Sequence, residues 1–564
     1  MYEPSCLIGF PACAGKVLNM FANTVNKNRF VCSTALMLLV ANWSLGQTLS
    51  QKIDAEVSKP IADFEKKAAP LCSDLEFIRR VTLDLIGTIP TVEQSREFVK
   101  STNVNKRSEL VDALLASPAH SWYFAMVLDV TLMERRADKH VPSANWKQYL
   151  RESLLANKPY DVMVKEILSA DGVDAKMRPA AKFYLDREGE PHLITRDISR
   201  LFLGVNWQCA QCHDHPRVED YKQDLYYGLF AFFNRSYVFT DAKTKQSVFA
   251  EKGEGDASFQ SVFDPAKVTK SSGPKLFMRA AIAEPKMEKG KEYEVAPTKE
   301  VRGIPKFSRR SQLANELARG DFEPFARNGA NRLWAHMMGR GIVHPLDLGH
   351  GDNPASHPEL LDLLAKEFVK AKFNHKEILG QIAKSKAYQR SSQVPKGLQD
   401  PKPEEYLVGA IRPLSEEQFA YAILQASGFT DAERMILGAK VEEAALQAKL
   451  APQATPIINA LATPAGQAPG YEARVEQALY LANNGQLQGL LAPRKGSLSF
   501  RLSEIKDAKL FAEELYLGVL TRMPTEDEKK EVEVLLGKKD VDKASLIRDL
   551  VWALMTSIEF RFQV

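Results

Sequence analysis

One short stretch of this chain combines residue types at a spacing that suits cofactor chemistry. In "GVNWQCAQCHDHPRVEDY", residues 204–221, Cys209, Cys212 and His213 stand in the order Cys-x-x-Cys-His. In an exported protein this pattern is typical of covalent haem attachment, in which two thiols add to the vinyl groups and the histidine binds the iron from the proximal side. The sequence therefore predicts a covalently held c-type haem at this motif.

Two other interpretations of the same residues stay open. Thiolate and imidazole groups also suit zinc or iron, so Cys209, Cys212, His213 and His215 are candidates for a bare metal site. Ligands this close in sequence rarely complete a tetrahedral site alone. A Cys209–Cys212 disulfide would suit an oxidising compartment, but it leaves the adjacent histidine unexplained. We therefore favour haem over a metal ion or a structural cysteine pair.

A second stretch is rich in metal-ligating residue types. "WAHMMGRGIVHPLDLGHGDNPASHPELL" contains four histidines and two aspartates as candidate ligands: His336, His344, His350, His357, Asp347 and Asp352. These groups suit a distal iron ligand or a separate metal site. The glycines of the stretch indicate a turning loop, and Ser356 with Glu359 predicts a capping box that opens a helix. In that case the histidines would be ordinary surface residues.

The N-terminus indicates export. Two basic residues precede an apolar run at 30–41, which is too short to cross a membrane because a spanning helix needs about 20 apolar residues. Ser44 and Gly46 suit a signal-peptidase cut before Gln47. We expect residues 1–46 to be a cleaved signal peptide, with an uncleaved anchor as the alternative, and a periplasmic or extracellular location. No transmembrane segment is expected after cleavage.

Composition narrows the class of protein. The chain has 564 residues, with 75 Lys and Arg against 71 Asp and Glu, and this near balance argues against a nucleic-acid-binding protein. Hydrophobic residues make up 45% and charged residues 26%, as in an ordinary globular protein. After the signal peptide only Cys72, Cys209 and Cys212 remain, so no disulfide framework is expected.

The hydrophobic pattern predicts a mainly α fold, with two helical domains joined by a small β-containing insertion. Residues 47–235 read as the first helical domain, and "SDLEFIRRVTLDLIG" within it has the start and stop signals of a capped helix. Residues 236–305 contain short apolar pieces broken by Gly, Pro and Lys, which indicates the β-containing insertion or a linker. Helical patterning returns over 306–564.

Short sequence patterns predict where several helices begin and where the motif lies relative to the preceding helix. Capping boxes are predicted by three pairs of residues, Thr91 with Gln94, Ser415 with Gln418, and Thr525 with Glu528. "TRDISRLFLGVNW" predicts a helix with Thr195 near its N-cap, so the motif should lie at or just beyond a helix end. Downstream aromatic residues suit either the wall of a haem site or an ordinary helix core: Tyr226, Tyr227, Phe230 and Phe233.

Long segments of the chain resemble a known pair of domains. "EFIRRVTLDLIGTIPT", "NKPYDVMVKEILSADG" and the motif followed by "DLYYGLFAFFNR" resemble the planctomycete cytochrome-like domain of unknown function. "FARNGANRLWAHMMGRGIVHPLDLGHGDNPASHPELLDLLAKEF", "AKSKAYQRSS" and "DLVWALMTSIEFRF" resemble its companion C-terminal domain. The resemblance implies an exported protein of Planctomycetes or related bacteria and supplies no reaction. Many relatives carry a further N-terminal cytochrome domain, which we expect to be absent here.

These observations favour an exported c-type-cytochrome-like protein that takes part in electron transfer or a haem-dependent oxidation with an unknown redox partner. The alternatives are a non-haem metalloprotein, such as a hydrolase of exported polymers that uses His213 and His215 with ligands from the second stretch, and a binding protein with a structural cysteine pair. Phosphate loops, nucleophile elbows and His-Glu-x-x-His helices are missing from the sequence, which leaves open whether it is an enzyme. The haem interpretation predicts that His213 faces a cleft wide enough for a porphyrin.

Overall fold

The computed structural model describes residues 46–438, 440–466, 474–538 and 541–563, and the predicted signal peptide lies outside them apart from Gly46. Helices account for 54% and strands for 6%, which confirms the predicted mainly α fold. Within the described ranges, no helix combines the length and apolar character that crossing a membrane requires.

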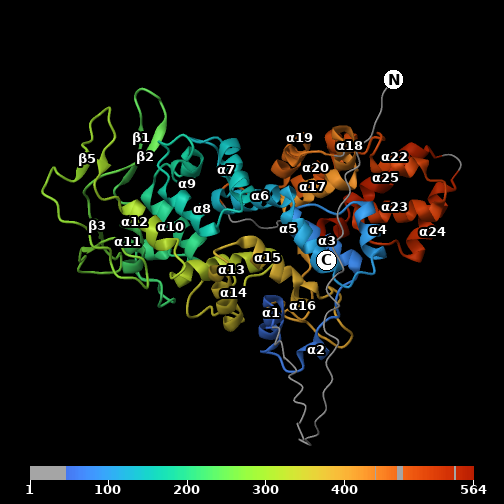
Figure 1. The fold of residues 1–564 in the computed structure, drawn as a ribbon, viewed down its shortest axis with the longest axis horizontal. Coiled ribbons are helices and arrows are strands. Elements are labelled where there is room, and N and C mark those ends of the chain that lie inside the picture. The colour runs from blue at the N-terminus through green and yellow to red at the C-terminus, as the bar shows by residue number, and fades with distance from the viewer. Residues whose placement is uncertain (1–45, 439, 467–473, 539–540, 564) are drawn as a thin grey trace, which may run out of the picture. The chain divides into compact units, whose positions relative to one another are not determined.

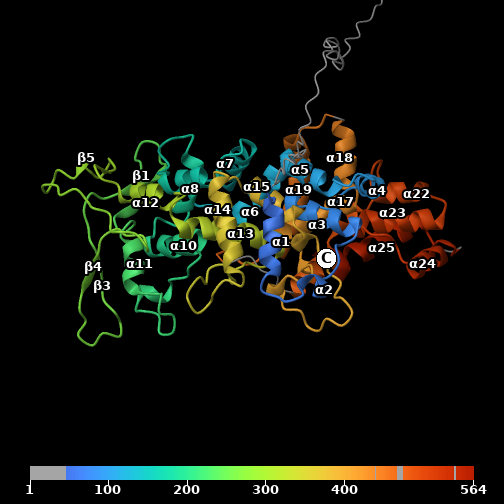
Figure 2. The ribbon, with the colours of Figure 1, turned by 60° about the horizontal axis from the view of Figure 1, so that its bottom comes forward.

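The chain before the β-containing region is helical (Figures 1 and 2). Its helix α3 (Asp74–Ile86) begins where the Ser73 side chain accepts a hydrogen bond from the Glu76 amide, and it ends at Gly87, whose φ is 73°. A side chain at Gly87 would meet the Tyr123 ring at 2.2 Å, so glycine is required there. The other helices of this region are α1 (Leu49–Ser58), α2 (Phe64–Lys67), α4 (Val92–Lys100), α5 (Lys106–Ala116), α6 (Pro118–Met133), α7 (Ser143–Leu155), α8 (Tyr160–Ser169), α9 (Lys182–Leu185), α10 (Pro191–Leu203) and α11 (Gln223–Phe230), with 3₁₀ turns η1 (Arg178–Ala181) and η2 (Cys209–Gln211).

The β-containing region consists of short antiparallel pairs, as the sequence predicts for residues 236–305. The pairs are β1 (Ser236–Thr240) with β2 (Ser247–Glu251), β3 (Ala257–Phe259) with β4 (Lys270–Ser272), and β5 (Tyr293–Val295) with β6 (Ile304–Pro305). In the first pair Ser236 lies opposite Glu251 and Thr240 opposite Ser247. A further pair, β7 (Arg412–Pro413) with β8 (Phe562–Gln563), joins two distant parts of the C-terminal region.

Helices resume after β6 and continue through the C-terminal region (Figure 1). They are α12 (Arg309–Leu317), α13 (Glu323–Met338), α14 (Pro358–Lys370), α15 (His375–Lys384), α16 (Lys386–Gln389), α17 (Glu416–Ala426), α18 (Phe429–Leu437), α19 (Glu443–Leu461), α20 (Val475–Asn483), α21 (Gly485–Leu490), α22 (Leu498–Glu504), α23 (Ala508–Leu520), α24 (Glu526–Leu536), α25 (Lys543–Met555) and α26 (Ile558–Arg561), with the 3₁₀ turn η3 (Pro403–Glu405).

Two hydrophobic cores hold these helices together. The first includes Trp146 from α7 and Trp334 from α13, so it contains side chains from both sides of the β-containing region. The second is built mainly from helices after residue 414, with Leu83 of α3 packed into it. Helix α3 therefore contributes to both cores, since its Phe77 belongs to the first. The boundaries 47–235, 236–305 and 306–564 stay a prediction.

Local capping signals were mostly read correctly. The boxes at Thr91, Ser415 and Thr525 are all present with the predicted partners. The box of Ser356 with Glu359 is wrong, because Pro358 opens α14 and makes His357 the N-cap residue, while the Ser356 hydroxyl donates to the Ile342 carbonyl.

The start of α10 was also misplaced. We predicted Thr195 near its N-cap, but α10 begins at Pro191, and the side chain of Glu190 accepts hydrogen bonds from the first amides. Thr195 lies inside the helix, where its hydroxyl donates to the Pro191 carbonyl. Proline at the first helical position suits the fixed φ of its ring, and this signal was available in the sequence.

Candidate functional site

Helix α10 delivers the Cys-x-x-Cys-His motif. It ends at Gly204, whose φ is 71°, and a side chain there would meet the Asn328 amide oxygen at 2.9 Å. The chain then buries Trp207, which lies edge-on to Phe277 at 5.4 Å, and enters the 3₁₀ turn η2. The motif therefore lies just beyond a helix end, as predicted.

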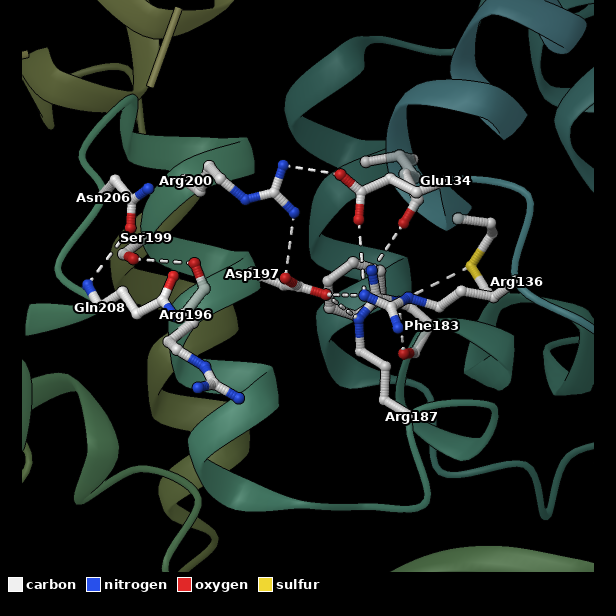
Figure 3. A network of polar contacts seen from close by, with 12 residues as sticks. Glu134, Arg136, Phe183, Arg187, Arg196, Asp197, Ser199, Arg200, Asn206 and Gln208 are labelled. Carbon is white, nitrogen blue, oxygen red and sulfur yellow. Dashed lines mark hydrogen bonds and ion pairs between the residues drawn. The ribbon is translucent and has the colours of Figure 1, made fainter. Parts of the chain in front are cut away.

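A buried network of charges fixes α10 (Figure 3). Asp197 accepts hydrogen bonds from Arg187 Nε at 2.6 Å and Arg200 Nη2 at 3.1 Å, and Arg136 lies 3.2 Å away. Arg200 also donates to Glu134 at 2.7 Å. Burial opposes ionisation of Asp197, but the neighbouring guanidinium groups, Arg187 first, hold its pKa below the ordinary value. The motif thus starts from a firmly held helix.

The carboxyl end of α10 is capped by side chains from α13. Asn328 Nδ2 donates to the Leu201 carbonyl and Arg332 Nη2 donates to the Arg200 carbonyl, each at 2.8 Å. These carbonyls belong to the last turn of the helix, which lacks intrahelical donors. The sequence gives no sign of these two capping residues, because nothing local to α10 indicates a donor more than a hundred positions away.

The motif turn (residues 209–213) leaves its three groups accessible to solvent. Cys209 and Cys212 are exposed free thiols, and His213 is half-buried. The amides of Cys212 and His213 both donate to the Cys209 carbonyl, at 3.2 and 3.3 Å, which closes the turn. His213 Nδ1 lies 2.7 Å from the Asp214 carbonyl, which only accepts, so Nδ1 carries the proton and Nε2 keeps a free lone pair.

Exposed apolar side chains lie beside the motif turn. The Val262 amide donates to the Cys212 carbonyl at 3.0 Å, which ties the loop between β3 and β4 to the turn. The ring centroid of Phe263 lies 4.5 Å from that of His213, and the Phe263 side chain is 72% exposed. Phe263 is not predicted from the sequence, because it lies in a polar, proline-containing loop far from the motif.

His215 has a structural role in the loop that follows. Its Nδ1 accepts hydrogen bonds from the amides of Arg217 and Val218, at 3.2 and 2.9 Å. Its ring lies edge-on to the buried Tyr221, with the centroids 5.9 Å apart. Because Nδ1 accepts, Nε2 carries the proton of the neutral ring, so this tautomer offers no lone pair to a metal.

The loop that contains His350 packs against the loop that follows the motif turn. Tyr221 lies edge-on to His350 at 5.4 Å and its hydroxyl donates to the Gly349 carbonyl at 3.3 Å. The Gly349 amide in turn donates to the Gly204 carbonyl at 2.9 Å. Burial raises the pKa of Tyr221 to about 12. His350 is thus separated from His215 by one aromatic ring.

The remaining candidates of the second stretch occupy different surroundings. His336 Nε2 donates to the Asp84 carbonyl at 2.8 Å, and His357 Nε2 donates to the Val57 carbonyl at 3.2 Å. Burial lowers the pKa of both imidazoles. His344, Asp347 and Asp352 lie in the connecting loop, exposed or half-buried. Across the described ranges, no three His, Cys, Asp or Glu side chains gather in a way that could hold a metal ion.

The porphyrin-wide cleft expected at His213 coincides with neither of two cavities in the described part of the chain. Cavities of about 370 and 440 Å³ are lined by other residues, and neither includes the motif turn. The downstream aromatic residues belong to the core: Tyr226 and Phe233 are fully buried, and Tyr227 stacks on Phe259 at 4.3 Å. The Tyr227 hydroxyl donates to the Gln211 carbonyl at 3.0 Å and so supports the motif turn from inside.

Comparison with known families decides the relationship of the chain. Residues 52–237 match the family PSCyt2, described as a protein of unknown function (DUF1549), and residues 309–463 match PSD1, likewise described as a protein of unknown function (DUF1553). The chain contains a PSCyt2 domain followed by a PSD1 domain. This confirms the predicted resemblance to planctomycete cytochrome-like families. A search of curated proteins and a search of solved structures gave no match.

The two matched domains meet at the helix that carries the motif. The motif turn and α10 lie in the PSCyt2 match, whereas Asn328 and Arg332, which cap α10, lie in the PSD1 match. The PSD1 domain therefore helps to fix the position at which the PSCyt2 motif begins.

The PSCyt2 motif turn fits covalent haem attachment in its donor set. Both thiols are free and exposed, so they are accessible to the vinyl groups, and His213 keeps its Nε2 lone pair. A backbone carbonyl on Nδ1 is the usual way in which proteins orient a metal-binding imidazole. The apolar Val262 and Phe263 lie beside it on an open surface.

Proposed function

We propose that this protein is an exported c-type-cytochrome-like electron carrier, with haem attached to Cys209 and Cys212 and His213 as the proximal ligand. The observation that carries the proposal is the hydrogen bond from His213 Nδ1 to the Asp214 carbonyl, next to two exposed free thiols. A bound haem would supply a one-electron redox centre. Export through residues 1–46 is part of the proposal, because c-type haem is attached outside the cytoplasm.

The residues around the motif turn have separate tasks in this function. The Asp214 carbonyl fixes the ring of His213 and makes Nε2 a better electron donor. Phe263 and Val262 provide apolar surface next to the imidazole, and an apolar macrocycle gains free energy by covering such surface. The hydroxyl of Tyr227 and the α10 network hold the turn in place.

Covalency gives the decisive test. The full chain is expressed with an export signal in a host that matures c-type cytochromes, then denatured, and its haem is followed by peroxidase staining of a gel and by the pyridine haemochrome spectrum. The wild-type polypeptide should keep its haem, because thioether bonds survive denaturation. The double variant Cys209→Ala with Cys212→Ala should lose it, and the matched control Cys72→Ala should keep it.

Other outcomes of this test would contradict the proposal. A colourless wild-type protein with stoichiometric zinc or iron would support a metal site, and His213→Ala and His215→Ala would then be the first variants to analyse. A colourless, metal-free protein with a Cys209–Cys212 disulfide would support the structural interpretation. His213→Ala is expected to retain covalent haem but to change its Soret and electron paramagnetic resonance spectra, because the proximal ligand is lost.

A further inference from the structure

A cavity of about 370 Å³ lies between α6 and α13, away from the motif turn. One wall is a face of α6 with Phe124, Leu128 and Leu132, and the opposite wall is a face of α13. Phe368 of α14 and other core side chains close its sides. Most of the lining is apolar, and the volume lies in the range of small-ligand sites.

The α13 wall carries a positive charge without a partner. Gly329, Arg332, Leu333 and His336 line the cavity, and their spacing places them on one face of the helix. Arg332 makes no ion pair with the described residues, and its buried Nε makes no hydrogen bond there. Its Nη2 donates to the Arg200 carbonyl. Burial lowers the pKa of Arg332, yet a guanidinium stays protonated at neutral pH.

Two carboxylates near Arg332, those of Asp347 and Glu134, act on it electrostatically, but neither forms an ion pair with it among the described residues. Glu134 pairs with Arg200 and Arg136, at 2.7 and 3.4 Å. Tyr160, another lining residue, is a neutral neighbour whose pKa is raised to about 12 by burial. A guanidinium held half-buried against apolar side chains carries a desolvation cost that an incoming anion would offset.

The other titratable groups on the cavity wall add no positive charge at neutral pH. His336, His344 and His375 line the cavity, and burial lowers the pKa of each. His375 Nε2 lies 3.4 Å from His120 Nε2, and this buried pair stacks around Phe124. Arg332 is therefore the charged group that an anion in this cavity would meet.

We propose that this cavity binds a monocarboxylate with an apolar body, the carboxylate on Arg332 and the body between α6 and α13. A guanidinium matches the two oxygens of a carboxylate better than any other cation of a protein. The cavity holds on the order of ten non-hydrogen atoms, since one water takes ~30 Å³ in the liquid. An eight-carbon fatty acid meets both requirements. This site is independent of the haem proposal, and Arg332 would bind the carboxylate in addition to its contact with the Arg200 carbonyl.

Calorimetric titration of the full chain with sodium octanoate tests the site, with 1-octanol and inorganic phosphate as comparison probes. Octanoate should bind at least tenfold more tightly than either, because octanol lacks the charge and phosphate lacks the apolar body. Arg332→Gln should weaken octanoate binding at least tenfold. The matched control Arg327→Gln removes the same charge from α13 at a residue paired with Asp362 and Glu323, and it should bind like the wild type.

Two further measurements keep the test decisive. Thr131→Phe places a larger side chain on the cavity wall without touching Arg332, and it should abolish octanoate binding. Circular dichroism and a thermal melt report whether Arg332→Gln is folded; if it is not, the decision rests on Thr131→Phe and on octanoate against octanol. Absence of octanoate binding, equal affinity for octanoate and octanol, equal affinity for phosphate, or unchanged binding by a folded Arg332→Gln would each overturn the proposal.

Discussion

The motif turn and the histidine segment (residues 336–357) are both rich in metal-ligating residues, but the structure treats them differently. The motif turn holds two thiols and an imidazole on the 3₁₀ turn η2 and the two residues that follow it, at the surface. The histidine segment spans the end of α13, a loop and the start of α14. Its imidazoles consequently separate: His336 binds the Asp84 carbonyl, His350 packs on Tyr221, and His357 binds the Val57 carbonyl. Closeness in the sequence keeps the motif groups on one turn, whereas the candidates of the histidine segment have separate partners.

Thiol labelling gives the largest expected contrast in accessibility. In apo protein purified without haem maturation, Cys209 and Cys212 should react rapidly with iodoacetamide, because both are exposed. Cys72 is 3% exposed and burial raises its pKa, so it should react about 10³-fold more slowly, since an opening that costs roughly 4 kcal/mol must come first. Mass spectrometry of tryptic peptides over time measures all three rates. Equal reaction rates for Cys72 and Cys209 would contradict the difference in thiol exposure between the core and the motif turn.

The α10 network should contribute much more to stability than the exposed motif turn. Asp197→Ala leaves Arg187 buried without its carboxylate partner and should lower the free energy of unfolding by about 3–5 kcal/mol. Glu152→Ala removes an exposed helical carboxylate and serves as the control, with an expected change within about 0.5 kcal/mol. Urea denaturation measures both. A loss below about 1 kcal/mol for Asp197→Ala would argue against the anchoring role of this network.

The buried pair His120 and His375 should make stability depend on pH. Burial lowers the pKa of His120 from 6.5 to about 4 and that of His375 well below 6.5. Below pH 6.5 the unfolded chain takes up protons that the folded pair does not bind. The free energy of unfolding should therefore decrease as the pH falls below 6.5, by about 1.4 kcal/mol per pH unit for each imidazole. The loss that His120 causes should reach roughly 3 kcal/mol at pH 4.

Urea denaturation between pH 7.5 and 5 checks this pH dependence before most carboxylates titrate. His375→Phe should make the slope shallower, because one of the two imidazoles is then missing and the new ring can still stack on Phe124. An unchanged slope in that variant would mean that other groups cause the pH dependence.

The smallest expected effect compares one histidine from each region. His357→Ala removes a 4% exposed ring and its hydrogen bond to the Val57 carbonyl, and it should cost about 2 kcal/mol. His213→Ala should change the stability of the apo protein by no more than about 0.5 kcal/mol, since its bond to Asp214 is exposed. Thermal melts and urea denaturation measure both. A larger loss for His213→Ala than for His357→Ala would reverse the structural and cofactor roles that we give to these residues.

Prediction from sequence succeeded where the cause is local. The capping boxes at Thr91, Ser415 and Thr525 depend on residues three positions apart, and all three are present. Prediction failed at Ser356 and Thr195, where a proline at the first helical position moved the helix start. The candidate site also separates local from distant causes. The motif turn is recognisable from adjacent residues, whereas its neighbour Phe263, some fifty residues further along, is not.

The sequence by itself determined the helical character of the chain, the β-containing region and the grouping of Cys209, Cys212 and His213, because each follows from side chains within a few positions. Tertiary structure alone decided that PSD1 residues cap the motif helix, that the histidine segment separates, and that Arg332 meets an apolar cavity without a carboxylate. Those outcomes depend on which helix faces pack together across more than a hundred residues. Contacts between distant helices depend on the packing of the whole core, so they cannot be predicted from a local sequence pattern.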